Sequence, residues 1–328
     1  MRILIIGAAG MIGRKLTTGL AKAGRVAGKE IVKLTLADVI KPEPGVYSGA
    51  VETIAADLSA PGAAQALIAS RPDLIFHLAA IVSGEAEADF EKGYRINLDG
   101  TRLLLEAIRM EGINRPYFPK LMYTSSIAVF GAPFPEAIGD EFFSTPLTSY
   151  GTQKAIGELL LNDYSRRGFV DGIGIRLPTI VIRPGKPNLA ASGFFSSILR
   201  EPLSGKEAVL PVSRDIRHWF ASPRAAVGFL LHAAELDTQA LGGRRTLSAP
   251  GLSATVGEEI EALRRVAGDK AVGLIRDEAD ERIIKIVAGW PRNFDARRAI
   301  SLGFRAEKSF DDIIRIHIED ELGGHIAV

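Results

Sequence analysis

The segment RILIIGAAGMIGRKL, residues 2–16, indicates the fold of this chain. An apolar run of strand length leads into three glycines, and an amphipathic helical pattern follows them. Glycines let a backbone approach a pyrophosphate closely, and a helix N-terminus offers unpaired amides and a positive dipole. We therefore predict a phosphate-binding turn at Gly7, Gly10 and Gly13, although tight packing of a helix on a strand would also require glycines there.

Apolar runs of this kind alternate with helical patterns along the first half of the chain. Six of them are short and apolar enough to be strands buried on both faces. They are residues 2–7, 31–38, 50–57, 74–80, 120–126 and 172–183. Helical patterns follow the first of them and also cover residues 97–112 and 149–168. This alternation predicts an α/β fold with a doubly wound parallel Rossmann sheet.

The ends of the predicted strands suggest which dinucleotide binds. Asp38 ends the second strand, about where a carboxylate accepts hydrogen bonds from the ribose hydroxyls. A carboxylate repels a 2′-phosphate, so NAD is favoured over NADP. Lys41 leaves NADP as a minor alternative, and Asp38 could instead merely end a strand. Further cofactor contacts are predicted at Met11, Ile12, Asp57, Leu58, Leu78, Ala79 and Ala80.

The pattern changes after Arg183, where a connection rich in Pro, Gly and Asn covers residues 184–195. We predict an NAD-binding Rossmann domain at residues 1–177, with a returning segment at about 215–248. Residues 178–214 and 249–328 should form a smaller C-terminal α/β lobe that binds the substrate. That lobe includes helical patterns at residues 253–268 and 308–323.

Composition excludes several classes of protein. The 328 residues include 40 basic and 39 acidic ones with no long run of either sign, which argues against nucleic acid or an anionic membrane as partner and favours a small molecule. The chain has no cysteine and no apolar run long enough to span a membrane, so we expect a cytoplasmic protein. Its histidines lack metal-ligand spacing, so we predict no metal and interpret His77 as packed or turn-bonded.

A second motif brings a serine, a tyrosine and a lysine together. Tyr150 and Lys154 lie one turn apart on a predicted helix, so both side chains project from one face. Ser125 and Ser126 end a buried strand, at the carboxyl edge of the sheet where ligands of open α/β sheets bind. A nearby ammonium favours the phenolate form of tyrosine, so Tyr150 can act as a base near neutrality.

The motifs GAAGMIG, SSIAVFG and YGTQK together resemble those of the extended short-chain dehydrogenase/reductase family, and the resemblance covers nearly the whole chain. It implies an NAD-dependent oxidoreductase with three catalytic residues: Tyr150 as general base, Lys154 as its ribose-binding partner and Ser126 as the hydroxyl that orients the substrate. It also implies that Ser125 assists in substrate binding.

Two further residues follow from the same resemblance. Asn97 matches the family's structural or relay asparagine, although it could equally cap a helix, and Pro178 is predicted to contact the cofactor. Phe130 stands where the family usually has a tyrosine, which disfavours a nucleotide-sugar substrate.

The resemblance also implies a substrate class. Arg217 aligns with the arginine that binds the anionic part of the substrate, and a guanidinium pairs well with a carboxylate. Arg183 and Arg200 are alternatives for this role. The segment 176–205 is compact beside nucleotide-sugar members of the family. A small acid therefore fits better than a nucleotide sugar, and the resemblance implies NAD-dependent oxidation of the C2 hydroxyl of a four-carbon sugar acid.

Other functions stay open on the sequence. A nucleotide-sugar epimerase of the same family is the main alternative, whereas Ile127 and Ala128 replace the acidic residues that a dehydratase needs. A non-catalytic NAD-sensing regulator is disfavoured because the catalytic trio is intact. The resemblance further implies a homodimer, formed by the helices around Leu103 and Leu159.

Overall fold

The computed structural model describes residues 1–45, 47–185 and 191–327. The chain divides into two compact units. The first consists of Met1–Val129, Thr148–Arg176 and Val227–Leu247, and the second of Phe130–Leu147, Leu177–Ala226 and Ser248–Val328. Residues 130–147 and about 215–226 belong to the second unit, whereas the predicted domain boundaries placed them in the first. The binding roles assigned to the two domains stay predictions.

A seven-stranded sheet is the central feature of the first unit. Its strands, in spatial order, are β12 (Thr246–Ser248), β8 (Asp171–Leu177), β7 (Lys120–Ser126), β6 (Leu74–His77), β1 (Arg2–Ile6), β4 (Lys33–Asp38) and β5 (Ala50–Ala55). Strand β1 pairs in parallel with β4 on one side and β6 on the other, and the pairs β4–β5 and β6–β7 are also parallel. This order is that of a doubly wound Rossmann sheet, so the predicted fold class is confirmed.

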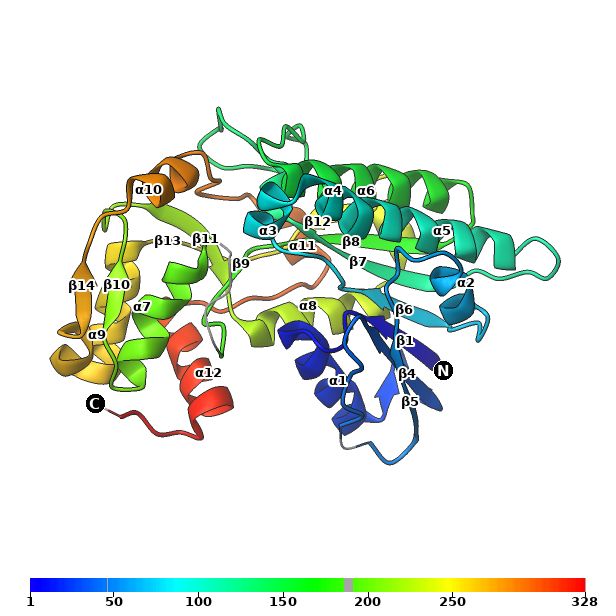
Figure 1. Cartoon of the computed structure of the whole chain (residues 1–328), viewed down its shortest axis with the longest axis horizontal. Coiled ribbons are helices and arrows are strands. Elements are labelled where there is room, and N and C mark those ends of the chain that lie inside the picture. The colour runs from blue at the N-terminus through cyan, green and yellow to red at the C-terminus, as the bar shows by residue number, and fades with distance from the viewer. Residues whose placement is uncertain (46, 186–190, 328) are drawn as a thin grey trace. The chain divides into compact units, whose positions relative to one another are not determined.

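Helices cover both faces of this sheet (Figure 1). On one face lie α1 (Met11–Ala23) and the part of α8 (Pro223–Glu235) that belongs to the first unit. The other face packs against α2 (Ala63–Ile68), α5 (Gly100–Glu111) and α6 (Ser149–Arg166). The predicted helical patterns that follow the first glycine turn and that begin near residues 97 and 149 correspond to α1, α5 and α6. Burial of apolar side chains between these layers stabilises the unit.

Shorter elements complete the first unit. They are β2 (Arg25–Val26), β3 (Lys29–Glu30), α3 (Ser83–Ala88), α4 (Phe90–Gly93), the π-helix η1 (Tyr94–Asp99) and the 3₁₀ helices η2 (Ile127–Val129) and η3 (Thr238–Leu241). The π-helix η1 leads directly into α5.

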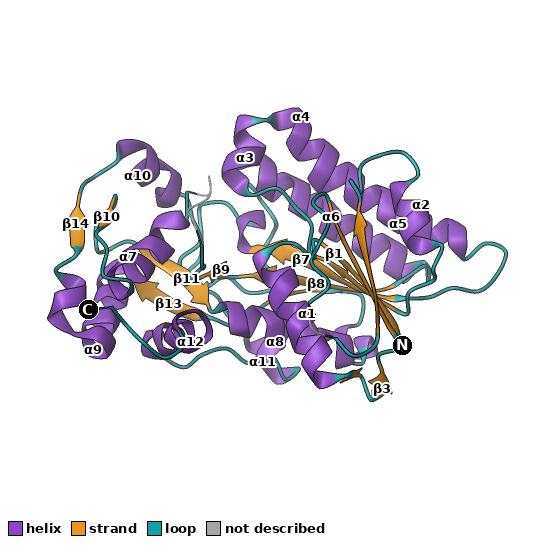
Figure 2. Cartoon of the chain, turned by 60° about the horizontal axis from the view of Figure 1, so that its bottom comes forward, coloured by secondary structure: helices purple, strands orange, loops and turns teal. Residues whose placement is uncertain are grey.

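The second unit has smaller sheets and its own helices (Figure 2). Its strands are β9 (Thr179–Ile180), β11 (Arg217–Ala221) and β13 (Leu252–Thr255) in one sheet, and β10 (Ala208–Leu210) and β14 (Ile275–Asp277) in another. Its helices are α7 (Gly193–Leu203), α9 (Val256–Val272), α10 (Glu281–Ala288), α11 (Arg297–Ser301) and α12 (Phe310–Leu322).

One predicted strand is wrong in its extent. Residues 172–183 do not form one strand, because β8 ends at Leu177 and the short β9 begins at Thr179. Pro178 separates them, and a proline cannot donate a backbone hydrogen bond to a neighbouring strand. Of the predicted connection at 184–195, residues 186–190 lie outside the described residues.

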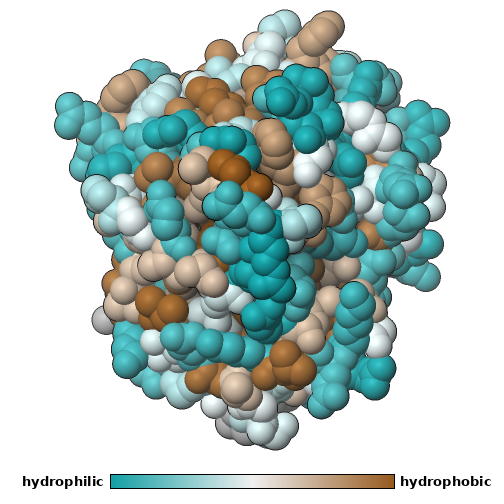
Figure 3. Space-filling model, turned by 90° about the vertical axis from the view of Figure 1, so that its right-hand side faces the viewer, coloured by the Kyte–Doolittle hydropathy of each residue, from teal (hydrophilic) through white to brown (hydrophobic). Residues whose placement is uncertain are grey.

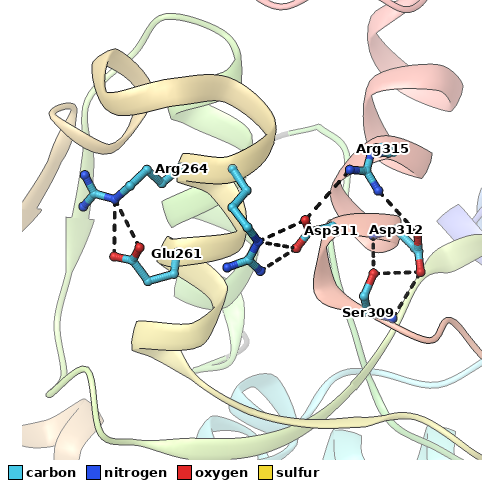
Figure 4. A network of polar contacts seen from close by, with 7 residues as sticks. Glu261, Arg264, Ser309, Asp311, Asp312 and Arg315 are labelled. Carbon is cyan, nitrogen blue, oxygen red and sulfur yellow. Dashed lines mark hydrogen bonds and ion pairs between the residues drawn. The ribbon is translucent and has the colours of Figure 1, made fainter.

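One ion pair joins helices α9 and α12 of the second unit, and further pairs lie within each helix (Figure 4). The Arg265 guanidinium on α9 donates to Asp311 on α12, with Nε and a carboxylate oxygen 3.1 Å apart. Ser309 and Asp312 form a capping box that satisfies the first amides of α12. Exposed pairs of this kind contribute little to stability, so we expect this network to add little to the stability of the unit.

The surface view in Figure 3 shows mostly hydrophilic side chains, with hydrophobic ones in small separate groups. Among the described residues, no helix combines the length and the apolar character that spanning a bilayer requires.

Candidate functional site

The glycines of the first turn serve different purposes. Gly7 has a φ of +93°, and a Cβ on it would lie 2.6 Å from the Ala79 amide nitrogen. A Cβ on Gly13 would lie 2.7 Å from the Ala8 Cα. The packing interpretation therefore holds for these two positions. Gly10 is exposed, and its Cβ would meet only the Gly7 carbonyl oxygen at 3.3 Å, so packing does not explain it.

The N-terminus of α1 is open to an anion. No side chain caps this helix at Gly10, and no described residue accepts a hydrogen bond from the amides of Met11, Ile12 or Gly13. Beside this end, the Ala9 amide donates to Asp38 Oδ2 at 2.9 Å, which ties the glycine turn to the end of β4. Unpaired amides, a helix dipole and a carboxylate one strand away suit the pyrophosphate and ribose of a dinucleotide.

Asp57 lies at the next strand end and is engaged within the chain. Its carboxylate accepts the Ser59 amide at 2.9 Å and the Arg95 guanidinium at 3.0 Å. Burial alone would raise the pKa of Asp57, but the hydrogen bonds from Ser59 and Arg95 outweigh it and hold the pKa below its usual range. Leu58 is buried and packs in the core beneath the sheet. Asp57 therefore carries its charge at neutral pH.

The segment after β6 is held close to the glycine turn. The amides of Leu78 and Ala79 both donate to the Ile6 carbonyl, at 2.8 and 3.0 Å. Asn97, on the π-helix η1, accepts the Ile81 amide at 2.9 Å and donates to the Gln153 side chain at 2.8 Å. Asn97 thus ties this segment to α6, and its predicted contact with the cofactor stays a prediction.

Helix α6 carries the tyrosine and the lysine as the sequence predicts. It begins at Ser149, where the Thr148 hydroxyl caps it by accepting the Gly151 amide at 3.0 Å. Lys154 is buried, and its Nζ donates to the Thr124 carbonyl on β7 at 2.8 Å. The same Nζ lies 5.8 Å from the centroid of the Tyr150 ring.

The charges around Lys154 are few. Burial lowers the pKa of Lys154 to about 8, and the negative charge of Glu158 opposes this shift. His77 is also buried, and burial together with the charge of Lys154 lowers the pKa of His77 to about 3. At pH 7 the imidazole is therefore neutral, while Lys154 mostly keeps its proton.

The two serines at the end of β7 face different partners. The Ser126 Oγ accepts the Ala128 amide at 3.1 Å, and no described residue accepts its proton, so the hydroxyl can donate to a substrate oxygen. Ser125 is buried, and its hydroxyl donates to the Glu158 carboxylate. Helix α6 contacts both β7 and η2, which brings Ser126 to the same end of the sheet as Tyr150.

The remaining predicted residues belong to the second unit. Arg217 donates to the Ser253 carbonyl at 3.0 Å and lies 3.2 Å from a Glu258 carboxylate oxygen. Pro178 is buried between β8 and β9. Phe130 is also buried and packs against the rings of Phe142 and Phe294. Ring centroids there are 5.9 and 5.8 Å apart, so Phe130 serves as a core residue of this unit.

Both alternatives to Arg217 are engaged within the second unit. The Arg183 Nε donates to the Ile180 carbonyl at 3.0 Å. Arg200 pairs with Glu201 at 2.6 Å and donates to the Arg183 carbonyl at 2.7 Å. These contacts link Arg200 to Arg183 and Arg183 to Ile180, and the predicted contacts of all three arginines with a substrate stay predictions.

Sequence reasoning missed four polar residues that surround the predicted trio: Thr124, Gln153, Glu158 and Arg176. Only Glu158 carried a signal, because it continues the four-residue spacing of Tyr150 and Lys154 along α6. In the part of the chain that the structure describes, no group of His, Cys, Asp or Glu side chains is arranged to hold a metal ion.

The fold and these residues define the class of the protein. The model of the NAD dependent epimerase/dehydratase family matches residues 3–239. The chain therefore belongs to this family, the extended short-chain dehydrogenase/reductases, and is an oxidoreductase of that family.

Individual relatives agree with the resemblance. The chain is 47% identical to the D-erythronate dehydrogenase of Cupriavidus necator, over 98% of both chains. It is 44% identical to that of Haemophilus influenzae, over 98% of this chain and all of the relative. The similarity to bacterial D-erythronate dehydrogenase, predicted from segments around residues 77–102, 123–131 and 183–203, is confirmed.

A solved structure is similar along the whole chain. It is the crystal structure of the nucleoside-diphosphate-sugar epimerase from Agrobacterium tumefaciens, with a TM-score of 0.97 and 68% sequence identity. The match covers 99% of this chain and 95% of that one.

Proposed function

We propose that the protein oxidises the C2 hydroxyl of D-erythronate to a 2-oxo-tetronate with NAD. The observation that carries this proposal is the similarity to two enzymes of that name along their full length, together with a Tyr150–Lys154 face arranged for alcohol oxidation. The relatives indicate the substrate, and the site supports the chemistry.

The side chains divide the work of the reaction. Ser126 donates its free proton to the C2 oxygen and so orients the hydroxyl. Tyr150 removes the proton of that hydroxyl as general base. The charge of Lys154, held in place by the Thr124 carbonyl, stabilises the phenolate that makes Tyr150 a base. Arg217 binds the substrate carboxylate, a role for which a guanidinium is well suited.

NAD would accept the hydride that leaves C2. The amides at the N-terminus of α1 would bind its pyrophosphate, and Gly10 leaves the space for it. Asp38 would accept hydrogen bonds from the adenosine ribose and disfavour a 2′-phosphate. Asp57, Leu58, Leu78, Ala79, Ala80, Asn97 and Pro178 would line the remaining cofactor surface. A homodimer in the cytoplasm is part of the same proposal.

A nucleotide-sugar epimerase is the second candidate. The similar structure from Agrobacterium tumefaciens carries that description, and epimerases of this family would use the same NAD and tyrosine chemistry. Against it stands Phe130, which lacks the tyrosine hydroxyl usual at this position and is buried in an aromatic cluster.

A substrate panel separates the two candidates. The purified protein is incubated with D-erythronate, its C2 and C3 stereoisomers and several nucleotide sugars, each with NAD and with NADP. Formation of reduced cofactor is followed by absorbance, and sugar products are followed by chromatography. We expect reduced NAD with D-erythronate. Conversion of a nucleotide sugar to its epimer, with no oxidation of any four-carbon acid, would replace the proposal with the second candidate.

A further inference from the structure

A buried ion pair lies one turn beyond Lys154 on α6. The Arg176 Nε on β8 lies 3.0 and 3.2 Å from the two Glu158 carboxylate oxygens, and Arg176 Nη2 lies 2.8 Å from Oε2. The Ser125 hydroxyl donates to the same carboxylate. The side chains of Glu158 and Arg176 are only 7% and 9% exposed. The proposed chemistry assigns no role to this pair.

The pair continues the face of α6 that carries the reaction. Tyr150, Lys154 and Glu158 are spaced four residues apart, so each step drifts only about 40° around the helix. Across from this face, Lys154 binds the Thr124 carbonyl and Glu158 binds the Ser125 side chain. Two successive residues of β7 are thus bonded to two successive turns of α6. The next residue of the strand is the proposed catalytic Ser126.

A contribution to the stability of the fold does not by itself explain why this ion pair is buried here. Removing two charges from water costs several kcal/mol, and well-packed apolar residues often stabilise a fold as well as a buried ion pair does. The pair instead fixes the relative position of the two side chains, because a guanidinium that contacts both carboxylate oxygens restrains their distance and their angle. Small displacements of reacting groups matter greatly, since an error of about 1 Å can cost about a hundredfold in rate.

We propose that Glu158 is a positioning residue for the reaction. Its carboxylate, held by Arg176 and Ser125, fixes the rotation of α6 against β7, so that the face with Tyr150 and Lys154 meets the end of the strand. Ser125 then acts through Glu158 and not by touching the substrate. This inference rests on the proposed function only in assuming that Tyr150 is the base.

The charged and titratable neighbours of Lys154 are consistent with this role. From β6 it faces His77, which is neutral, and from β7 it faces the Tyr123 ring, 4.9 Å from Nζ. On α6 itself its neighbours are Tyr150 and Glu158. Glu158 is thus the one carboxylate among these neighbours, and Arg176 prevents it from turning toward the lysine.

A double-mutant cycle tests the proposal. Ser125→Ala is made in the wild type and in the variant Glu158→Leu/Arg176→Met, whose apolar side chains replace the buried pair at similar volume. Asp163→Asn is the matched control, because it breaks an exposed ion pair with Arg166 on the same helix. Each variant is assayed for kcat, for the KM of the substrate and for the Kd of NAD.

We expect kcat to fall at least about tenfold in Ser125→Ala and in the Glu158→Leu/Arg176→Met variant, with the Kd of NAD within about twofold of wild type. In the background without the pair, Ser125→Ala should change kcat less than about twofold, because its partner is gone. The control should behave as wild type.

A second measurement needs no substrate. The ionisation of Tyr150 is followed by NMR of protein labelled with ¹³Cζ-tyrosine, and its signal is assigned by its loss in Tyr150→Phe. We expect Tyr150 to ionise at higher pH once the pair is removed. This titration tests the positioning role even if the protein proves to act on another substrate, so its failure is distinct from failure of the proposed function.

Two results would overturn the inference. If Ser125→Ala raises the KM of the substrate equally in both backgrounds, Ser125 contacts the substrate directly. If the variant without the pair keeps the kcat and the Tyr150 ionisation of wild type, the pair is only structural. Should that variant fail to fold, Ser125→Ala alone decides, because loss of positioning lowers kcat and leaves KM unchanged.

Discussion

Acid should destabilise this protein through its buried histidines. Burial lowers the pKa of His77 to about 3, with help from the charge of Lys154, and lowers the pKa of His218 to about 4. The unfolded chain takes up a proton at each imidazole near pH 6.5, but the folded chain does not. The unfolded state therefore binds more protons as the pH falls below 6.5, and stability that is complete above this pH is progressively lost.

The magnitude follows from the linkage relation. Each proton that only the unfolded state binds lowers the free energy of unfolding by about 1.4 kcal/mol per pH unit. Between pH 7 and pH 5, each buried histidine should therefore lower the free energy of unfolding by about 2 kcal/mol. Replacing His77 with Gln, whose amide can still donate to Thr101, should remove about 2 kcal/mol of this acid sensitivity. Urea unfolding followed by circular dichroism at both pH values measures the difference. His325→Gln, at an exposed position, is the control.

The contrary result would be an equal loss of unfolding free energy in His77→Gln and in wild type between pH 7 and pH 5. That result would mean that His77 is protonated in the folded protein despite its burial beside Lys154.

Four further substitutions have expected outcomes. Gly7→Ala should destabilise the protein by at least about 2 kcal/mol, because its backbone has a positive φ and the new Cβ would collide with Ala79. Gly19 lies inside α1, and a Cβ there would make ordinary contacts at 3.8 and 3.9 Å with Val227 and Leu231 on α8, so Gly19→Ala should instead stabilise the protein by about 0.5–1 kcal/mol. Thermal unfolding compares the two, and similar signs would contradict the account of the glycine turn. Asp38→Ser should lower kcat/KM with NAD about tenfold or more and raise the relative use of NADP, as measured by steady-state kinetics with both cofactors. An unchanged preference for NAD over NADP would mean that Asp38 does not bind the ribose. Thr148→Ala should cost about 1 kcal/mol by uncapping α6, as seen by denaturant unfolding, and no loss would mean that the cap is dispensable.

Local patterns in the sequence predicted much of the fold and of the site. Strand-length apolar runs predict the parallel sheet, because strands buried on both faces need apolar residues at nearly every position. The glycine turn predicts the connection from β1 to α1, because close approach of the backbone requires glycine at fixed positions. The spacing of Tyr150 and Lys154 placed them on one face of α6 for the same reason: helical periodicity is a local property.

The contacts that the sequence did not predict join residues on different elements that lie far apart along the chain. Glu158 and Arg176 lie on different elements, and Asn97 meets Gln153 across 56 residues, so neither contact has a local signature. The same applies to the contact of Ser125 on β7 with Glu158 on α6. The assistance of Ser125 in substrate binding, which the resemblance implies, stays a prediction. The break at Pro178 was visible in the sequence but was outweighed by the apolar residues around it.

In the proposed reaction, Tyr150 removes the proton from the C2 hydroxyl of a four-carbon sugar acid as hydride leaves C2 for NAD. The most direct measurement uses D-erythronate deuterated at C2, with wild type and Tyr150→Phe. We predict that wild type transfers the deuterium to the cofactor, and that Tyr150→Phe still binds NAD but forms no reduced cofactor. Undeuterated reduced cofactor from wild type, or near wild-type turnover by Tyr150→Phe, would contradict the account.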